Sequence, residues 1–382
     1  MRILFTAHGA YGHVFPMVAA AHALARAGHD VTVATAKNLC PTVSSLGLRA
    51  VAAGIDDVSM VAEARRRWPE TEHEPPAKWA VRMFTDIAAP AMITSLQSVL
   101  ADTRPELIVR EEGEHGGPVA AATAGIPWAT HGWGSPRPPL STRDALARAV
   151  TPLWHAAGLP APRASDLDGI GVLDPCPPSL YGDDAPLSAH SIRPETPATS
   201  SGANFRVSTA ERPLAYVGFG TVPLYRDRPE LITEIAEALL ARGFDPIITT
   251  PDPQLTRRLV SLAPGRVHVQ QWLSLPKTLQ ACALVACHGG AGTVLAALAA
   301  GIPLLLLPQG APSQARMSHA CQLRGVARVL DSRAADASTL DDAVHALTGD
   351  QYHTTAQQLA AEIAAMPRAD HAVTAIQTLL RP

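Results

Sequence analysis

Residues 284–301 read LVACHGGAGTVLAALAAG, and this stretch decides the fold. It opens with the short apolar run Leu284–Cys287, which is typical of a strand buried in a parallel sheet. A glycine-rich turn follows directly, and an Ala- and Leu-rich helical pattern covers Val294–Ala300. A strand, a glycine turn and a helix in direct succession predict an α/β unit of the Rossmann type.

The same alternation recurs along the rest of the chain. In the second half, further strands are predicted at 214–219, 246–249, 267–269 and 303–307, with a helix at 230–241. In the first half, strands are predicted at 3–7, 31–35 and 107–109, with helices at 13–27 and 118–124. We therefore expect an α/β protein of two doubly wound domains, facing each other across a cleft at the carboxyl ends of both sheets.

Residues 159–212 are rich in Pro, Ser and Gly and predict a connector between the two domains. The expected boundaries are an N-terminal domain over 1–190, a linker over 191–212 and a C-terminal domain over 213–366. A helical pattern within 367–382 predicts a last helix that packs back on the N-terminal domain.

Composition excludes several classes of protein. The chain has 382 residues, 47% of them hydrophobic, which is too apolar for a disordered chain. The formal net charge of −3 provides no drive toward nucleic acid or an anionic membrane. Five scattered cysteines form no C-x-x-C pair, so neither a disulfide framework nor a zinc site is expected. The sequence has no long uninterrupted apolar run. We therefore expect a soluble cytoplasmic protein that is monomeric or homodimeric.

The turn His288–Thr293 has the features of an anion site. Its glycines let backbone N–H groups approach an anion, and the helix that follows presents the positive end of its dipole. Thr293 adds a hydroxyl donor and His288 a ring donor. The alternative is a plain glycine-rich turn. The pattern is neither a Walker loop nor the usual dinucleotide fingerprint.

Neighbouring stretches carry a resemblance to a known family. QQWLSLP at 270–276 precedes the anion loop, and GIP at 301–303 and PQGAPSQ at 308–314 follow it. In this order and spacing they resemble the donor-binding region of family 1 glycosyltransferases, which have the two-domain GT-B fold. The closest resemblance is to bacterial enzymes that glycosylate natural products such as polyketides and macrolides. GAYGHVFP at 9–16, RPELIVREEG at 104–113 and VGFGT at 217–221 extend it over nearly the whole chain.

The resemblance implies roles for particular residues on the donor side. Trp272 would stack on the base of a nucleotide, with Leu273 beside it. The diphosphate would be bound by His288, Gly290, Gly292 and Thr293, with Gly220 and Thr221 on the opposite turn. Gln309, Ser313 and Gln314 would contact the sugar. No cofactor is implied, and the nucleoside diphosphate sugar would be a co-substrate.

The resemblance also implies a catalytic pair, in which His13 is the general base and Glu111 the carboxylate that orients it. The start of the helix at 13–27 is expected to keep the His13 ring neutral. The family usually has Asp in place of Glu111, and Glu112 is an alternative. His8 and Glu114 are expected to be solvated loop residues.

Aromatic residues gather in the first half of the chain and suggest an apolar pocket for a flat or hydrophobic acceptor. The candidates are Phe15, Trp79, Phe84 and Trp133, while Trp68, Met83 and Trp154 lie in the same region. The triplet Asp166-Leu167-Asp168 resembles a metal-binding D-x-D motif but falls in the connector. We expect it to be a solvated turn, and we expect that no metal is required.

Three departures from the family pattern concern the donor. Ala296 stands where many relatives have a Glu that holds the ribose hydroxyls, and Ser313 stands where an Asp commonly binds the sugar. The loop at 308–314 is one residue longer than usual. These departures favour a dTDP-linked deoxysugar over UDP-glucose.

The expected function is inverting, metal-independent transfer of a sugar to a hydroxyl of a hydrophobic natural-product aglycone. Three alternatives stay open at this point. They are a nucleotide-sugar 2-epimerase of the same fold, a C-glycosyltransferase, and a non-catalytic protein that binds a nucleotide and activates another glycosyltransferase.

Overall fold

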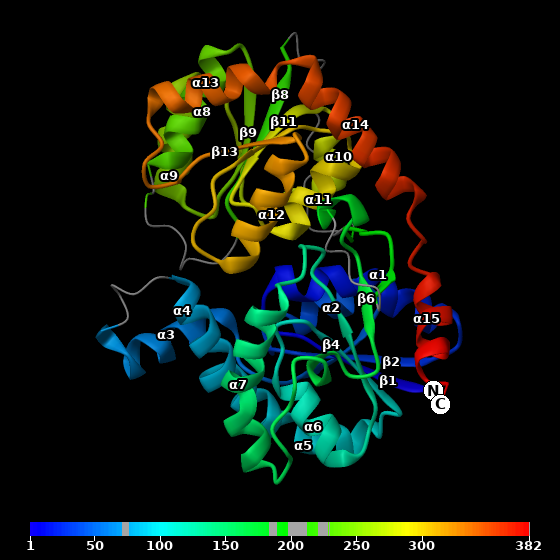
Figure 1. The fold of residues 1–382 in the computed structure, drawn as a ribbon. Coiled ribbons are helices and arrows are strands. Elements are labelled where there is room, and N and C mark those ends of the chain that lie inside the picture. Colours follow the sequence, from blue (N-terminus) through cyan, green and yellow to red (C-terminus); the bar gives the residue numbers. More distant parts are fainter. Residues whose placement is uncertain (71–75, 183–188, 198–211, 221–227, 229, 382) are drawn as a thin grey trace. The chain divides into compact units, whose positions relative to one another are not determined.

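The structure, a computed structural model, describes residues 1–70, 76–182, 189–197, 212–220, 228 and 230–381. The chain divides into two compact units (Figure 1). Unit 1 comprises Met1–Cys176, Asp184–Pro197 and Pro367–Pro382, and unit 2 comprises Pro177–Asp183 and Ala198–Met366. Each unit is built on one parallel sheet, as the alternation of strands and helices predicts.

Unit 1 has a seven-stranded sheet in the order β3-β2-β1-β4-β5-β6-β7. Its strands are β1 (Arg2–Thr6), β2 (Asp30–Thr35), β3 (Arg49–Ala52), β4 (Leu107–Glu111), β5 (Trp128–His131), β6 (Val172–Asp174) and β7 (Ala189–Ser191). All neighbouring strands in this order pair in parallel. The order reverses between β1 and β4, so the loops that follow these two strands diverge and leave a crevice at their carboxyl ends.

The helices of unit 1 follow its strands. They are α1 (Tyr11–Arg26), α2 (Cys40–Ser45), α3 (Asp57–Arg67), α4 (Pro76–Arg82), α5 (Ala89–Thr103), α6 (Gly116–Ala124), α7 (Leu140–Ala156) and α15 (His371–Leu379). A π-helical turn, η2 (Met83–Ala88), joins α4 to α5, and a 3-10 turn, η3 (Asp166–Asp168), precedes β6. Such π turns inside helices are frequent at functional sites.

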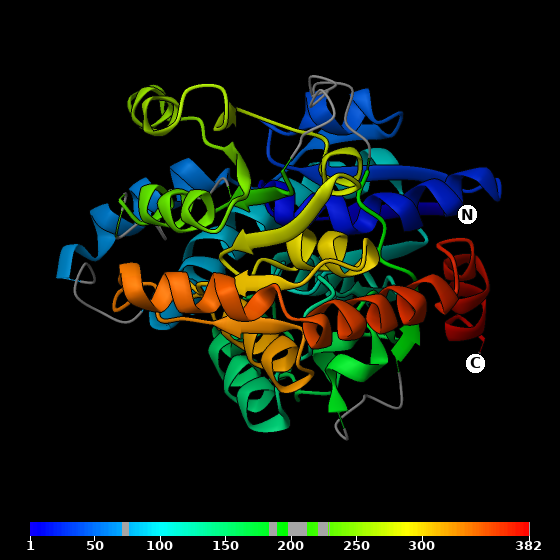
Figure 2. The same cartoon turned by 90° about the horizontal axis from the view of Figure 1, so that it is seen from above.

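The C-terminal helix belongs to unit 1. After α14 (Asp350–Ala365), the chain continues into α15, which packs against α1 (Figures 1 and 2). Ala372, Ala375 and Ile376 enter the same apolar core as Phe5, and Arg26 of α1 forms an ion pair with Asp370. The helix predicted within 367–382 therefore completes the core of the N-terminal unit.

Unit 2 has a six-stranded parallel sheet in the order β10-β9-β8-β11-β12-β13. Its strands are β8 (Leu214–Gly218), β9 (Asp245–Thr249), β10 (His268–Gln270), β11 (Cys282–Cys287), β12 (Leu304–Leu306) and β13 (Ala327–Val329). Its helices are α8 (Leu231–Ala241), α9 (Pro253–Leu262), α10 (Leu275–Leu279), α11 (Ala291–Ala299), α12 (Pro312–Leu323), α13 (Ala337–Leu347) and α14, with the 3-10 turn η4 (Pro178–Leu180). This is the strand order of a Rossmann fold, and its reversal lies between β8 and β11.

The structure corrects the predicted domain boundaries. The backbone N–H of Ser179, in η4, donates to Glu362 at 2.8 Å, and η4 packs on α12, so this turn belongs to unit 2 and not to an N-terminal domain ending at 190. The predicted linker 191–212 begins too early, because β7 pairs with β6 and Ile192 is buried in the core of unit 1.

Within the described residues, no helix combines the length and apolar character needed to cross a bilayer.

Candidate active site

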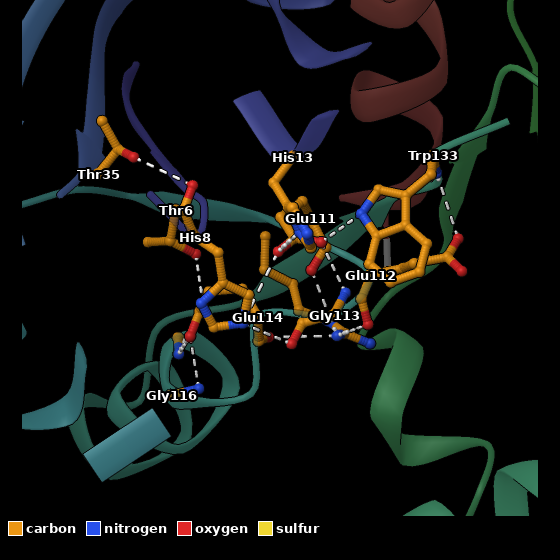
Figure 3. A network of polar contacts seen from close by, with 12 residues as sticks. Thr6, His8, His13, Thr35, Glu111, Glu112, Gly113, Glu114, Gly116 and Trp133 are labelled. Atoms are coloured by element: carbon orange, nitrogen blue, oxygen red, sulfur yellow. Dashed lines mark hydrogen bonds and ion pairs between the residues drawn. The ribbon is translucent and has the colours of Figure 1, made fainter. Parts of the chain in front are cut away.

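The switch point of unit 1 brings together two histidines and two carboxylates. His8 and His13 come from the loop after β1 and the first turn of α1, and Glu111 and Glu114 come from the end of β4 and the loop that follows it (Figure 3). The His13 Nδ1 atom lies 2.8 Å from Glu111 Oε1, although 98 positions separate the two residues. Because a carboxylate only accepts, Nδ1 carries the proton, and the neutral His13 ring has its lone pair on Nε2.

Glu111 is fully buried and uses both of its oxygens. Oε1 accepts from His13, while Oε2 accepts from the Trp133 indole N–H at 2.6 Å and from the Gly113 backbone N–H at 2.7 Å (Figure 3). Glu112, the alternative partner, instead accepts from the backbone N–H of Trp133 at 3.3 Å. The longer side chain of Glu therefore reaches His13, and Glu111 is the residue that contacts it.

The electrostatics of the pair run against the predicted effect of the helix dipole. Burial by itself favours the neutral His13 ring, but the charge of Glu111 and its hydrogen bond outweigh burial and raise the pKa of His13 above its ordinary 6.5. Burial also opposes ionisation of Glu111, yet the charge and hydrogen bond of His13 lower its pKa to about 2. The start of α1 was expected to favour the neutral His13 ring, but the buried carboxylate at 2.8 Å acts more strongly on the ring and shifts its pKa in the opposite direction.

The expectation that His8 and Glu114 are solvated is also wrong. His8 is 5% exposed, lies 2.8 Å from the Gly113 carbonyl through Nε2, and stacks on Phe84 with ring centroids 4.7 Å apart. Burial lowers the pKa of His8 to about 4, so its ring is neutral at pH 7. The T-shaped contact of His8 with His13, at 5.4 Å, makes it part of the wall of the site.

Glu114 is fully buried because the N-terminus of α6 takes up its carboxylate. The backbone N–H groups of Gly116 and Gly117 and the Thr6 hydroxyl all donate to it. This is the capping arrangement in which a carboxylate complements a helix dipole. Glu114 therefore ties β1 to α6 and has a structural part in the site.

Arg110 is a buried residue that the sequence did not single out. Its guanidinium donates to the backbone carbonyls of Glu111, Glu112 and Glu114, and so holds the loop that carries both carboxylates. An Arg at the end of an apolar strand, directly before two acidic residues, was the only signal for this role.

The predicted acceptor residues separate into two groups. Trp133 and Phe84 face His13, with ring centroids 5.1 and 5.6 Å from its ring. Phe15 instead packs against Tyr11 and the core of unit 1. Trp79 is 8% exposed within α4. Of the other aromatics, Trp154 is part of an apolar core cluster, and Arg82 stacks over Trp68 at 4.0 Å.

The prediction that the D-x-D triplet forms a solvated turn is wrong. Asp168 is mostly buried and forms ion pairs with Arg137 and Arg143, while Asp166 pairs with Arg163. In the part of the chain that the structure describes, no group of three or more His, Cys, Asp or Glu side chains is arranged to hold a metal ion.

The switch point of unit 2 assembles the predicted anion loop. His288 follows β11 directly, Gly290 is the N-cap of α11, and Gly292 and Thr293 lie in the first turn of that helix. A methyl group added at Gly290 or at Gly220 would press on the His288 ring, and Gly220 has a φ of +71° that favours glycine. Gly220 therefore lies beside His288 across the switch point, as predicted. Thr221 lies outside the described residues.

The remaining donor residues line the same carboxyl edge. Trp272 and Leu273 follow β10, the former half-buried and the latter 5% exposed. Gln309 follows β12, and its backbone N–H donates at 2.9 Å to Oε1 of Gln314, a buried residue in the first turn of α12. Ser313 is half-buried beside it. All of these residues therefore come from loops at one edge of the sheet, where ligands of doubly wound folds bind.

The chain is similar to known proteins over nearly its whole length. The chain matches the two domain models of the erythromycin biosynthesis protein CIII-like family, the N-terminal domain over residues 22–193 and the C-terminal domain over residues 240–379. It is 28% identical to the L-demethylnoviosyl transferase of Streptomyces niveus over 96% of this chain and 95% of the relative. It is 27% identical to the elloramycin glycosyltransferase of Streptomyces olivaceus over 96% and 94%.

Solved structures share the fold. The glycosyltransferase SsfS6 of Streptomyces sp. SF2575, complexed with thymidine diphosphate, has a TM-score of 0.76 at 24% identity over 99% of each chain. The spinosyn rhamnosyltransferase SpnG, complexed with spinosyn aglycone, has a TM-score of 0.79 at 24% identity over 99% of this chain and 100% of that one. The chain belongs to the erythromycin biosynthesis protein CIII-like family and is a natural-product glycosyltransferase with a two-domain, Rossmann-like GT-B fold.

Proposed function

We propose that this glycosyltransferase moves a deoxysugar from a dTDP-sugar to a hydroxyl of a hydrophobic natural-product aglycone, with inversion and without a metal ion. The buried His13–Glu111 pair at the switch point of unit 1 is the observation that carries the proposal. The relative with thymidine diphosphate and the relative with an aglycone support the two substrate classes.

In the proposed reaction, His13 is the general base. With Nδ1–H held by Glu111, the free lone pair of Nε2 accepts the proton of the acceptor hydroxyl. The hydroxyl oxygen then forms a bond to the anomeric carbon while the bond to the diphosphate oxygen breaks on the opposite face, which inverts the centre. Glu111 stabilises the imidazolium that forms.

The leaving diphosphate takes up the bonding electrons and is stabilised by unit 2. The first N–H groups of α11, the hydroxyl of Thr293 and the ring of His288 all belong to the turn and the first helical turn that follow β11. Preorganised donors of this kind stabilise negative charge where it develops. A helix N-terminus can therefore stabilise the leaving diphosphate without a metal ion. Trp272 would stack on the thymine, as an aromatic ring can stack on any base.

Apolar surface beside the base supports a hydrophobic acceptor. Phe84 and Trp133 flank His13, and the side chain of His13 is 18% exposed. A flat aglycone placed against these rings would bring a hydroxyl to Nε2 of His13. The same base could serve a carbon nucleophile, so the product must be analysed for an oxygen or a carbon linkage.

The proposal predicts a particular pH dependence. Because the base must be neutral, we expect kcat/KM to fall as the pH drops through the pKa of His13, with a midpoint above 6.5. Glu111→Gln removes the charge that raises this pKa, so burial dominates and the midpoint moves to lower pH, while maximal activity falls less than in His13→Ala. Glu112→Gln is the matched control: Glu112 hydrogen-bonds to the Trp133 backbone, and its charge has the smallest of the effects that raise the pKa of His13, so its loss should move the midpoint much less. A larger loss of activity at Glu112 than at Glu111 would reassign the orienting role.

The expected preference for a dTDP-deoxysugar rests on two positions that have no carboxylate to accept a hydrogen bond from the donor. Ala296 offers no carboxylate to a ribose hydroxyl, and Ser313 replaces an Asp. Oε1 of Gln314 already accepts from Gln309, so a contact of Gln314 with the sugar would use its amide N–H donors. A sugar with fewer hydroxyl donors leaves fewer of them without a partner. We expect TDP to bind more tightly than UDP, and a dTDP-deoxysugar to be turned over faster than UDP-glucose. The reverse order in competition binding and in turnover contradicts this donor preference.

One assay separates the proposed transferase from its rivals. Donor consumption is followed with and without a panel of hydrophobic aglycones, and the products are identified. A transferase consumes donor in step with the glycoside it forms. An epimerase converts the sugar nucleotide without an acceptor, and a nucleotide-binding auxiliary protein consumes no donor.

A further inference from the structure

Trp133 contributes more to the site than an apolar wall. Its ring lies edge-on to the His13 ring at 5.1 Å and 81°, and its indole N–H points at Oε2 of Glu111 (Figure 3). At 2.6 Å this is a short hydrogen bond to a buried carboxylate. Hydrogen bonds to ionised groups are roughly twice as strong as neutral ones.

We propose that Trp133 is a positioning residue for the His13–Glu111 pair, whose indole N–H holds the Glu111 carboxylate in the orientation that receives His13. The inference rests on the proposed function, in which His13 is the base. It goes beyond that function because it assigns a task to the indole N–H and not to the ring face that an acceptor would touch.

Glu111 has a particular need for such a residue. Its side chain has one more rotatable bond than an Asp side chain, so more rotamers must be excluded to keep Oε1 on His13. Oε2 is fixed from two directions, by the Trp133 indole from the loop after β5 and by the Gly113 backbone from the loop after β4. With Oε2 fixed, rotation of the carboxylate away from His13 would break two hydrogen bonds.

The surroundings of Trp133 are built for this orientation. A methyl group added at Gly113 would overlap the Trp133 ring, so the indole packs directly on the backbone that also donates to Glu111. The Trp133 backbone N–H is held by Glu112 at 3.3 Å. The indole is therefore held at its backbone and along its ring, with its N–H aimed at Glu111.

The effect of Trp133 on the His13–Glu111 pair can be measured through the pKa of His13. The charged groups that act on His13 are Glu111 and Glu112 from β4 and its loop, and Asp57 from α3, all of which raise its pKa. His8, from the loop after β1, faces the same ring and is neutral at pH 7. The Trp133 N–H keeps the carboxylate of Glu111 turned toward His13. Its removal frees the carboxylate to rotate, which weakens the charge and hydrogen bond that raise the pKa of His13, so this pKa should fall.

The test is Trp133→Phe, which keeps an aromatic ring and removes the N–H. We expect the acid limb of kcat/KM to move to lower pH by about 0.5 unit, a threefold change in the ionisation constant, with a reduced plateau. Trp128→Phe is the matched control. Trp128 lies on β5, and its indole N–H has no partner within the described residues, so this variant should leave the limb in place.

Two further variants keep the test decisive if Trp133→Phe folds poorly. Gly113→Ala displaces the indole while preserving its N–H, and it should shift the limb in the same direction. In a Glu111→Gln background, Trp133→Phe should no longer move the limb, because the carboxylate charge is absent. Melting temperatures show which variants are folded.

The outcomes separate this inference from the proposed function. If Trp133→Phe loses activity without moving the limb relative to Trp128→Phe, Trp133 only packs against the site and the inference is overturned. An unchanged plateau and an unchanged limb overturn it as well. The role of His13 is judged separately, since only full activity in a folded His13 variant contradicts it.

Discussion

His13→Ala is expected to lower kcat by about 10²–10⁴, the usual contribution of a positioned general base. His13 lies 2.8 Å from Glu111 with a side chain that is 18% exposed, whereas His8 lies 3.9 Å from Glu111 and is 5% exposed. The anion loop belongs to the other unit, so the affinity for TDP should be almost unchanged. The measurements are kcat under donor saturation and TDP binding by calorimetry.

A second variant separates chemistry from stability. Removing His13 leaves Oε1 of the buried Glu111 carboxylate without its hydrogen-bond donor, which destabilises by about 1–3 kcal/mol. His13→Asn retains an amide donor near the position of Nδ1 but has no basic nitrogen, so it should remain folded and show the same loss of kcat. A folded His13→Asn enzyme with wild-type kcat would exclude His13 as the base.

The sequence predicted the fold well because the fold depends on local patterns. Apolar runs before glycine turns mark the strands, and β11 with its loop and α11 lie where residues 284–300 predict them. The strands β3, β6, β7 and β13 were missed. Both β6 and β7 lie in the segment predicted to be a connector, where three residues among Pro and Ser carry no periodicity. The segment Ala189–Ser191 forms β7 because it pairs with the edge of β6, and this pairing is a property of the tertiary structure.

The candidate site was predicted in its residue types and less well in its contacts. His13 and Glu111 were paired from the resemblance, but only the folded chain shows that Glu111, and not Glu112, reaches the ring. His8 and Glu114 follow strands in polar loops, which is why solvent exposure was expected. They are buried because β1 and β4 are neighbours at the switch point, so that α6 covers Glu114 and Phe84 covers His8.

The second large effect is expected at His288. Its ring lies at the end of β11, beside Gly220 and Gly290, where the first N–H groups of α11 point out of the helix. His288→Ala removes a hydrogen bond to an anion, worth about 1.5–3 kcal/mol, so TDP should bind about 10- to 100-fold more weakly. Thymidine has no phosphate, and its binding should change little. The ratio of the two affinities is therefore the quantity to measure.

A related experiment tests whether the N-terminus of α11 can bind the diphosphate without a metal ion. EDTA should leave turnover of the wild-type enzyme unchanged, because the donors at α11 are backbone and side-chain groups of the protein. His13→Asn serves as the control, since it lowers turnover and should leave TDP affinity as in the wild type. Equal weakening of thymidine and TDP by His288→Ala would mean that the ring acts on the nucleoside. Strict dependence of turnover on added Mg²⁺ would mean that an ion, and not the α11 N-terminus, neutralises the leaving diphosphate.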